Sequence, residues 1–118
     1  MLPPKLPKKP KRETRWRSQA HLTFVRSHQC SVPGCQQMPI EAAHVRLGSH
    51  TGIGQKPDDW RAVSLCKDHH AAQHTHGEWT FWHKQLSGLD VDALIDSFCK
   101  ASPKAAEIRK IRQEREVS

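Results

Sequence analysis

The chain has 118 residues, of which 36% are hydrophobic, 6% aromatic and 26% charged. This length and composition allow one compact domain with extended ends and exclude a large apolar core, so an added stabilising element such as a bound metal is expected. The formal net charge of +7 suits a polyanionic partner, although charge alone does not distinguish a nucleic-acid-binding protein from any other basic protein.

The sequence gives no sign of export or of membrane insertion. The N-terminal residues are prolines and lysines without the apolar stretch of a signal peptide, and no apolar run is long enough to span a bilayer. We therefore expect a cytoplasmic protein with no membrane partner. Thiols stay reduced in that compartment, which favours metal binding over disulfides for the four cysteines, Cys30, Cys35, Cys66 and Cys99.

Composition divides the chain into three ranges. Residues 1–13 contain four prolines and a run of lysines with little to bury, so residues 1–15 are predicted to be a flexible, disordered basic arm that contacts phosphates. Residues 16–87 are predicted to form the central domain with a structural zinc. Residues 88–118 are predicted to form C-terminal helices that pack on this domain or extend from it.

The central range is predicted to be mixed α+β. The apolar pattern of 16–28 does not separate a helix from a strand, and we favour a helix. Residues 40–46 are predicted to form a strand, 47–59 a glycine-containing loop, and 62–65 the return strand. A helix is predicted to begin at Lys67 and to end near Gly77.

More helix is predicted after residue 77. Residues 78–86 can be helical, and three aromatic residues there are expected in the core rather than on a base-stacking surface: Trp79, Phe81 and Trp82. The apolar stripe of 91–98 predicts an amphipathic helix that Asp90 could cap. Ser102 and Pro103 predict the start of a last helix, whose charged stretch 107–116 is expected to be solvated.

The first group of residues with chemical potential has the ligand spacing of a zinc site. Cys30 and Cys35 flank a Pro-Gly turn, and Cys66 stands three residues before His69 at the start of the predicted helix. Three thiolates and one imidazole suit a closed tetrahedral structural zinc site. Cys99 is expected to be a buried small side chain, with a role as substitute ligand if His69 turns elsewhere.

The second group is histidine-rich. His70 and His74 are four residues apart, so a helix places them on one face and turns them away from His69. His44 on the preceding strand is a candidate general base, and a divalent ion on His70 and His74 could neutralise a phosphate. The alternatives are two surface histidines on the helix and a packed histidine on the strand.

These segments resemble the HNH (ββα-metal) endonuclease superfamily, and more closely its small phage- and prophage-associated members with a Cys-x2-His-His-x3-His helix. The resemblance covers roughly residues 28–82. It lies in Ala42-Ala-His-Val-Arg46, in Gly52-Ile-Gly-Gln-Lys-Pro-Asp-Asp59 and in Leu65-Cys-Lys-Asp-His-His-Ala-Ala-Gln-His74-Thr-His-Gly77. It implies a small ββα-metal core with a zinc knuckle and flanking helices.

The resemblance also implies roles for individual residues. His44 corresponds to the general base, Asp59 or alternatively Asp58 to the asparagine that orients it, and His70 and His74 to ligands of a catalytic divalent ion (Mg, Mn, Zn or Ni). Two positions depart from the family pattern. Ala43 stands where a further metal ligand is frequent, which leaves more water on the ion or recruits Asp59. Aspartate replaces the central asparagine, and a carboxylate raises the pKa of a neighbouring histidine.

Three functions follow as hypotheses. The first is an endonuclease acting on nucleic acid, with DNA as the expected substrate, Arg46 and Lys56 as phosphate contacts, and a recombination or packaging protein as a candidate partner by resemblance to the phage proteins. The second is a non-catalytic zinc-stabilised module that binds nucleic acid and needs only the Cys/His cluster. The third is a metal-stabilised protein-interaction domain, for which no apolar groove is evident in the sequence.

Overall fold

The computed structural model describes residues 15–49, 56–86 and 88–117 and has a small mixed α+β fold. The predicted basic arm, apart from Arg15, and residues 50–55 of the predicted loop lie outside the described residues. In chain order the elements are α1 (Gln19–Arg26), β1 (Ile40–His44), the 3-10 turn η1 (Asp59–Arg61), β2 (Ala62–Cys66), α2 (Lys67–His76), the π-helical η2 (Thr80–Gln85), α3 (Val91–Ala101) and α4 (Ala105–Val117).

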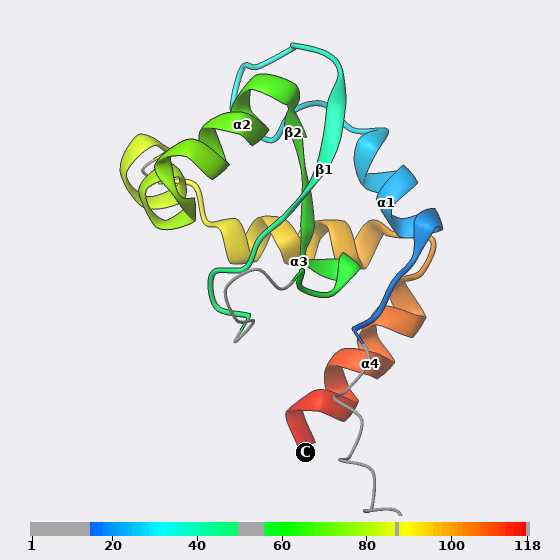
Figure 1. Ribbon diagram of the computed structural model, residues 1–118. Coiled ribbons are helices and arrows are strands. Elements are labelled where there is room, and N and C mark those ends of the chain that lie inside the picture. The colour runs from blue at the N-terminus through cyan, green and yellow to red at the C-terminus, as the bar shows by residue number, and fades with distance from the viewer. Residues whose placement is uncertain (1–14, 50–55, 87, 118) are drawn as a thin grey trace, which may run out of the picture.

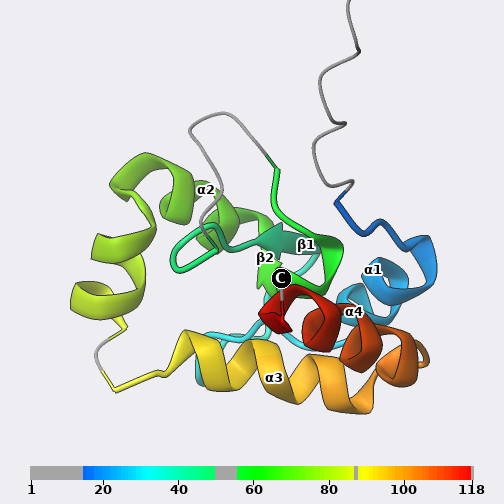
Figure 2. The ribbon, with the colours of Figure 1, turned by 90° about the horizontal axis from the view of Figure 1, so that it is seen from below.

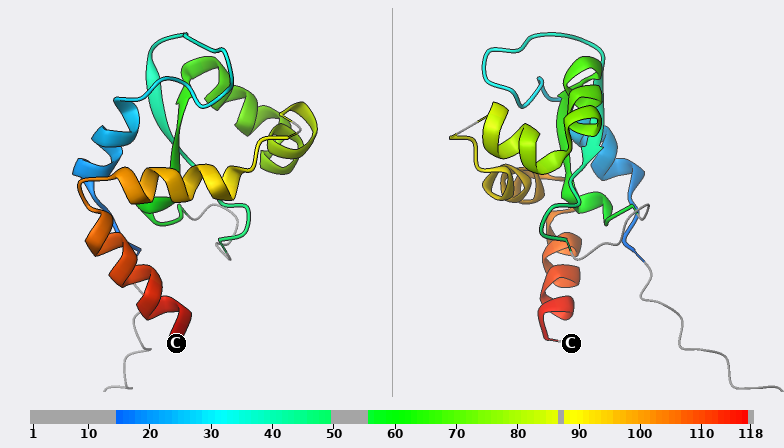
Figure 3. Two further views of the ribbon diagram at one scale, coloured as in Figure 1. Left: turned by 180° about the vertical axis from the view of Figure 1, so that it is seen from behind. Right: turned by 60° about the vertical axis from the view of Figure 1, so that its left-hand side comes forward.

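The two strands form one antiparallel pair, as predicted. The register places Ile40 opposite Cys66 and His44 opposite Ala62. All positions of β2 are buried, because helices pack on several sides of the strands: α1 and α2 flank them, and α3 crosses them (Figures 1 and 3). β2 begins directly after η1 and ends at Cys66, where α2 follows.

Side-chain caps explain where the helices begin. The Ser18 hydroxyl accepts a hydrogen bond from the backbone N–H of His21 at 3.2 Å and caps α1. The Asp90 carboxylate accepts from the N–H groups of Asp92 and Ala93, at 3.0 and 3.1 Å, which confirms its predicted cap on α3. The predicted helix from Lys67 is confirmed as α2. Among the described helices, none has the length and apolar character needed to cross a membrane.

The charged residues of α4 are mostly exposed, but one face of the helix is buried. The helix turns back beside α3 (Figure 2), and Ile108 is only 1% exposed in the core. The Glu107 carboxylate accepts a hydrogen bond from the Trp16 indole N–H at 3.0 Å, and Arg115 pairs with buried Asp58. These contacts join residues 57 to 91 positions apart in the sequence, which local periodicity does not reveal.

The aromatic segment after α2 is only partly in the core. Phe81 and Trp82 are each 1% exposed, as predicted, and the Trp82 indole donates to the side-chain oxygen of Gln73 at 3.0 Å. Trp79, however, is 55% exposed, so its predicted core position is wrong. It packs against His83 and Lys84 instead.

The docking of α4 leads to a stability prediction. Ile108→Ala should lower the free energy of unfolding by about 2–5 kcal/mol, because it leaves a cavity in the core. Ile111→Ala on the same helix, where the side chain is half-buried, should cost about 1 kcal/mol. Denaturant titration of both variants measures the difference, and equal small effects would mean that α4 is not docked in solution.

Candidate metal centre and adjoining cleft

The first pair of cysteines sits on a loop that is tied to β2. Gly34 has φ +79°, and Cys35 N–H donates to the Val32 carbonyl at 3.0 Å, which closes the Pro-Gly turn between the two thiols. The backbone N–H of Ser31 donates to the Ser64 carbonyl at 2.8 Å, and the two hydroxyls are 3.0 Å apart. These bonds hold the loop beside the end of β2, where Cys66 lies.

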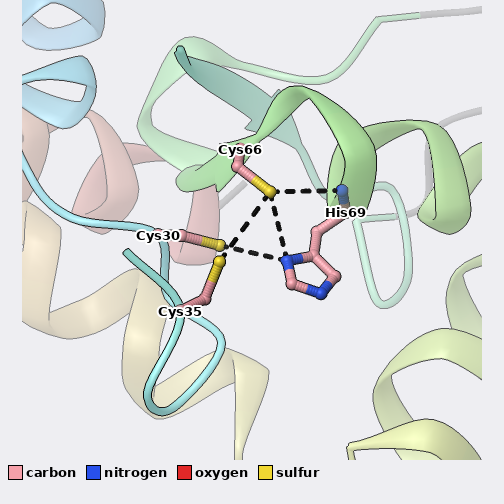
Figure 4. Close-up of side chains that lie close together, drawn as sticks. All are labelled: Cys30, Cys35, Cys66 and His69. Atoms are coloured by element: carbon pink, nitrogen blue, oxygen red, sulfur yellow. Dashed lines mark hydrogen bonds between the residues drawn. The ribbon is translucent and has the colours of Figure 1, made fainter. Parts of the chain in front are cut away.

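Cys30, Cys35, Cys66 and His69 converge in this region (Figure 4). Their ligand atoms all lie within 4.8 Å of one another. His69 Nδ1 is 3.4 Å from Cys30 Sγ and 3.2 Å from Cys66 Sγ, and the Cys35 and Cys66 sulfurs are 3.9 Å apart. Ligands of a tetrahedral zinc ion are about 3.5–3.8 Å apart, because Zn–S is about 2.3 Å and Zn–N about 2.0–2.1 Å. The cluster could therefore hold a structural metal such as zinc.

Local structure presents these ligands to one point. Cys66 ends β2 and caps α2, its sulfur accepting the His69 N–H at 3.4 Å, so both side chains face the same side of the first turn. Burial raises the pKa of the Cys30 thiol, whereas the backbone N–H of Gln37 lowers the pKa of the Cys35 thiol. Metal ligation would require deprotonation of both thiols.

Cys99 is not part of this cluster. It lies on α3, and its thiol contacts the Trp60 carbonyl at 3.3 Å. Burial raises the pKa of Cys99 to about 11, which keeps it a thiol at neutral pH. The described structure thus places Cys99 in the core, as expected, and His69 rather than Cys99 at the cluster.

A cleft of about 520 Å³ lies between α1 and α2 along β1. His44 contributes from β1, and His70 and His74 from α2. Arg26 of α1, together with Arg46 and Lys56, adds positive charge. The remaining lining residues are Leu22, Ala42, Pro57 and Glu78.

His44 is held by a carboxylate. Its Nε2 is 2.8 Å from Asp59 Oδ1. Burial lowers the pKa of His44, and the adjacent Asp59 only partly offsets this effect, so the imidazole stays neutral at pH 7. As expected from the sequence, the aspartate by itself raises the pKa of His44. Burial lowers that pKa by more, so the net change is a decrease.

Asp59 remains ionised although it is buried. Burial alone would raise the pKa of its carboxyl, but hydrogen bonds with His44, the Ser18 backbone N–H and Arg17 lower that pKa overall. The Ser18 and Arg17 contacts measure 2.8 and 3.1 Å. Because an ionised carboxylate only accepts, His44 Nε2 must carry the shared proton, which leaves Nδ1 as the nitrogen able to take another.

The two helix histidines approach each other at the cleft. His70 Nε2 and His74 Nε2 are 3.2 Å apart, and His70 Nδ1 lies 2.8 Å from Glu41 Oε1. Two imidazole nitrogens bound to one ion at about 2.0–2.1 Å would be separated by about 2.9–3.4 Å. The pair has the spacing of two ligands, although no third His, Cys, Asp or Glu among the described residues completes a metal-binding group with it.

The two candidate phosphate contacts differ in their surroundings. The Glu78 carboxylate accepts from the backbone N–H groups of Arg46 and Leu47 and lies 3.7 Å from Arg46 Nε. Arg46 is therefore partly neutralised within the protein. Lys56 is exposed at the cleft, and its carbonyl is fixed by the Arg17 guanidinium at 3.1 Å.

A family model described as a protein of unknown function (DUF968) matches residues 2–101. The chain belongs to this family. Comparison with curated proteins and with solved structures found no match. The DUF968 match spans both the metal centre and the cleft but assigns no activity to either.

In this DUF968 chain, most of the site residues that were predicted from the sequence fall into two groups. The Cys/His cluster is one, and the cleft brings together His44, His70, His74, Arg46 and Lys56. The contacts also separate the two aspartates. Asp59 binds His44, whereas Asp58 accepts a hydrogen bond from the backbone N–H of Trp16 at 2.7 Å and pairs with Arg115. The catalytic and binding roles of the cleft residues remain predictions.

Several residues near the cleft were not found from the sequence. Arg26 lines it from α1, and Glu41 contacts His70. Buried Gln73 donates to the His44 carbonyl at 3.4 Å and links α2 to the end of β1. A polar residue at a core position of a predicted helix is the one signal that could have pointed to Gln73.

The cluster leads to a prediction about metal content. Purified protein should hold about one zinc ion per chain, and its removal by a chelator should unfold the domain. Cys66→Ser should reduce zinc content and lower the melting temperature, whereas Cys99→Ser should retain the ion. Elemental analysis and circular dichroism measure both quantities. A folded Cys66→Ser protein with full zinc content would contradict the assignment of this cluster.

The cleft leads to a prediction about His44. Its pKa should lie below 6.5, and Asp59→Asn should lower it further, because the substitution removes the carboxylate that opposes the effect of burial; Lys56 and Arg17 already act in the lowering direction. As pH falls below about 6.5, His44 would become protonated in the unfolded chain before it does in the folded protein. Its titration would therefore lower the free energy of unfolding.

Titration of the His44 ring signal by NMR measures this shift. Asp58→Asn is the matched control, because that neighbouring carboxylate contacts Trp16 rather than His44. An increase in the His44 pKa in Asp59→Asn would overturn the explanation.

Proposed function

We propose that this chain is a metal-dependent endonuclease of the HNH type that hydrolyses phosphodiester bonds in nucleic acid, with DNA as the expected substrate. The observation that carries the proposal is that His44, fixed by Asp59, shares a cleft with the His70–His74 pair. A base and a pair of metal-binding nitrogens on one cleft are the parts that phosphodiester hydrolysis needs. The chain order β1, β2, α2 agrees with a ββα-metal core.

The charge around the cleft suits a phosphate backbone. Arg26, Arg46 and Lys56 surround it, on a chain with a formal net charge of +7. Guanidinium groups bind phosphate oxygens in a bidentate manner, and ammonium groups bind them as point charges. These groups would hold a strand by its backbone, so binding should weaken as salt concentration rises.

His44 has the state required of a general base. With Nε2 donating to Asp59, Nδ1 can accept a proton from a water molecule as that water attacks phosphorus. The new P–O bond forms as the bond to the leaving sugar oxygen breaks. Asp59 stabilises the imidazolium that results and keeps the ring oriented, and the lowered pKa of His44 keeps the base neutral beforehand.

His70 and His74 would hold the catalytic divalent ion, for which Mg, Mn, Zn and Ni are candidates. Such an ion would supply Lewis-acid neutralisation of the phosphate and of the leaving oxygen. Ala43 is fully buried and does not line the cleft, so it adds no ligand. Asp59 is committed to His44 and Arg17. The remaining coordination positions would be left to water and substrate.

The zinc at the Cys/His cluster would have a separate, structural role. It would join the 30–35 loop to the first turn of α2 and so fix the helix that carries His70 and His74. A zinc ion bound by both Cys35 and Cys66 would close the chain between them into a loop. Closing such a loop stabilises the fold by restricting the unfolded chain. The resemblance to small phage and prophage proteins supports a further proposal, that the enzyme acts in recombination or packaging with a protein partner.

Plasmid cleavage tests the proposal. Purified protein should nick DNA with Mg²⁺ or Mn²⁺, and His44→Ala should lower the rate by about 10²–10⁴-fold, because a general base is lost. His70→Ala and His74→Ala should abolish the cleavage that added metal supports. His76→Ala is the matched control, since this exposed histidine lies on α2 but does not line the cleft.

The assay also separates the enzyme from a binding module. If the parent never nicks DNA or RNA with any of the four metals, while it and the His44→Ala protein bind nucleic acid equally, the proposed activity is overturned. Retained zinc and unchanged melting temperature in each variant would exclude misfolding as the cause of a lost activity.

A further inference from the structure

Glu41 makes a contact that the proposed reaction does not use. It lies on β1, three residues before His44, and its carboxylate reaches across to α2. Glu41 Oε1 is 2.8 Å from His70 Nδ1, and the two side chains are 45% and 22% exposed. A carboxylate only accepts hydrogen bonds, so Nδ1 of His70 must carry the proton in this contact.

That proton position determines what the other nitrogen of the ring can do. A neutral imidazole protonated at Nδ1 has its lone pair at Nε2. His70 Nε2 is the atom that lies 3.2 Å from His74 Nε2. Glu41 thus favours the tautomer in which His70 offers a lone pair toward His74, the arrangement that a shared metal ion requires.

We propose that Glu41 is a positioning residue that orients His70 and fixes its tautomer for binding of a divalent ion by His70 and His74. This inference rests on the proposed function, because it assigns a role at the same metal site. Carboxylates that hold the second nitrogen of a ligating histidine tune affinity in many metalloproteins, and their loss weakens metal binding by about 10–100-fold.

The position of Glu41 fits this role. Its backbone belongs to the paired part of β1, opposite Leu65, so its Cα is fixed by the sheet. The contact joins residues 29 positions apart and connects α2 to β1, the strand that also carries His44. One strand therefore presents both the base and the group that aligns a metal ligand.

A plain ion pair is the competing explanation. Glu41 and His70 could simply help α2 pack on β1, as partly exposed pairs often do with little effect on stability. The two explanations differ in what they predict for metal affinity. A packing role would change the melting temperature without changing the affinity of the His70–His74 site for an ion.

Calorimetric titration of Ni²⁺ into the zinc-loaded protein tests the inference, because imidazole is a favourable ligand for nickel. The parent should bind one ion beyond zinc, and His70→Ala and His74→Ala should each abolish this binding. Glu41→Gln and Glu41→Ala should raise its Kd by about 10–100-fold. Glu114→Gln makes the same charge change at an exposed position of α4 and should leave Kd unchanged.

The ¹⁵N chemical shifts of the His70 ring provide a second readout. The zinc-loaded parent without nickel should show the Nδ1-protonated tautomer, and Glu41→Ala should shift the ring toward the other tautomer. Nickel binding equal to the parent in folded Glu41 variants would overturn the inference and leave the proposed function standing. Absence of nickel binding in the parent, or binding that persists in His70→Ala, would overturn both the metal site and the role of Glu41.

Discussion

The pairing register of β1 and β2 is the constraint on which both sites depend. It sets Ile40 opposite Cys66 and His44 opposite Ala62. A shift by one residue would turn every side chain of β1 to the opposite face of the sheet. His44 would then leave Asp59, and Glu41 would leave α2. Two hydrogen bonds between Ser31 and Ser64 attach the cysteine-bearing loop to β2, and the bond from Gln73 to the His44 carbonyl attaches α2 to β1, so each site is tied to one of the paired strands.

The electrostatics of the cleft show how burial and pairing act against each other. His44 and Asp59 are neighbours and both are largely buried, so each group loses hydration and gains a hydrogen-bond partner. For the carboxylate, several donors outweigh burial and the pKa falls. For the imidazole, one acceptor does not outweigh burial and its pKa also falls. The result is a neutral ring beside a charged carboxylate, which neither residue type alone would reveal.

The sequence predicts local features well and distant contacts poorly. Alternation, turn residues and capping residues were enough to predict the strands, α2 and the Asp90 cap, and ligand spacing was enough to predict the Cys/His cluster. Periodicity did not distinguish a docked α4 from an extended one, because Ile108 and Ile111 are too few among charged residues to form a clear apolar stripe. The contacts of Glu41 and Gln73 depend on how α2 lies against β1, which no local pattern encodes. The exposed Trp79 shows the converse, since an aromatic cluster need not be buried throughout.

Helix α2 serves two chemically different sites with adjacent residues. His69 turns to the cysteines and His70 to the cleft, since successive residues on a helix differ by about 100° in direction. The length of chain from Cys66 to His74 is consequently not free to vary. An insertion or deletion of one residue inside it would rotate one set of imidazoles away from its neighbours while leaving the other in place. Any relative that carries such a change can keep the metal centre or the cleft, but not both.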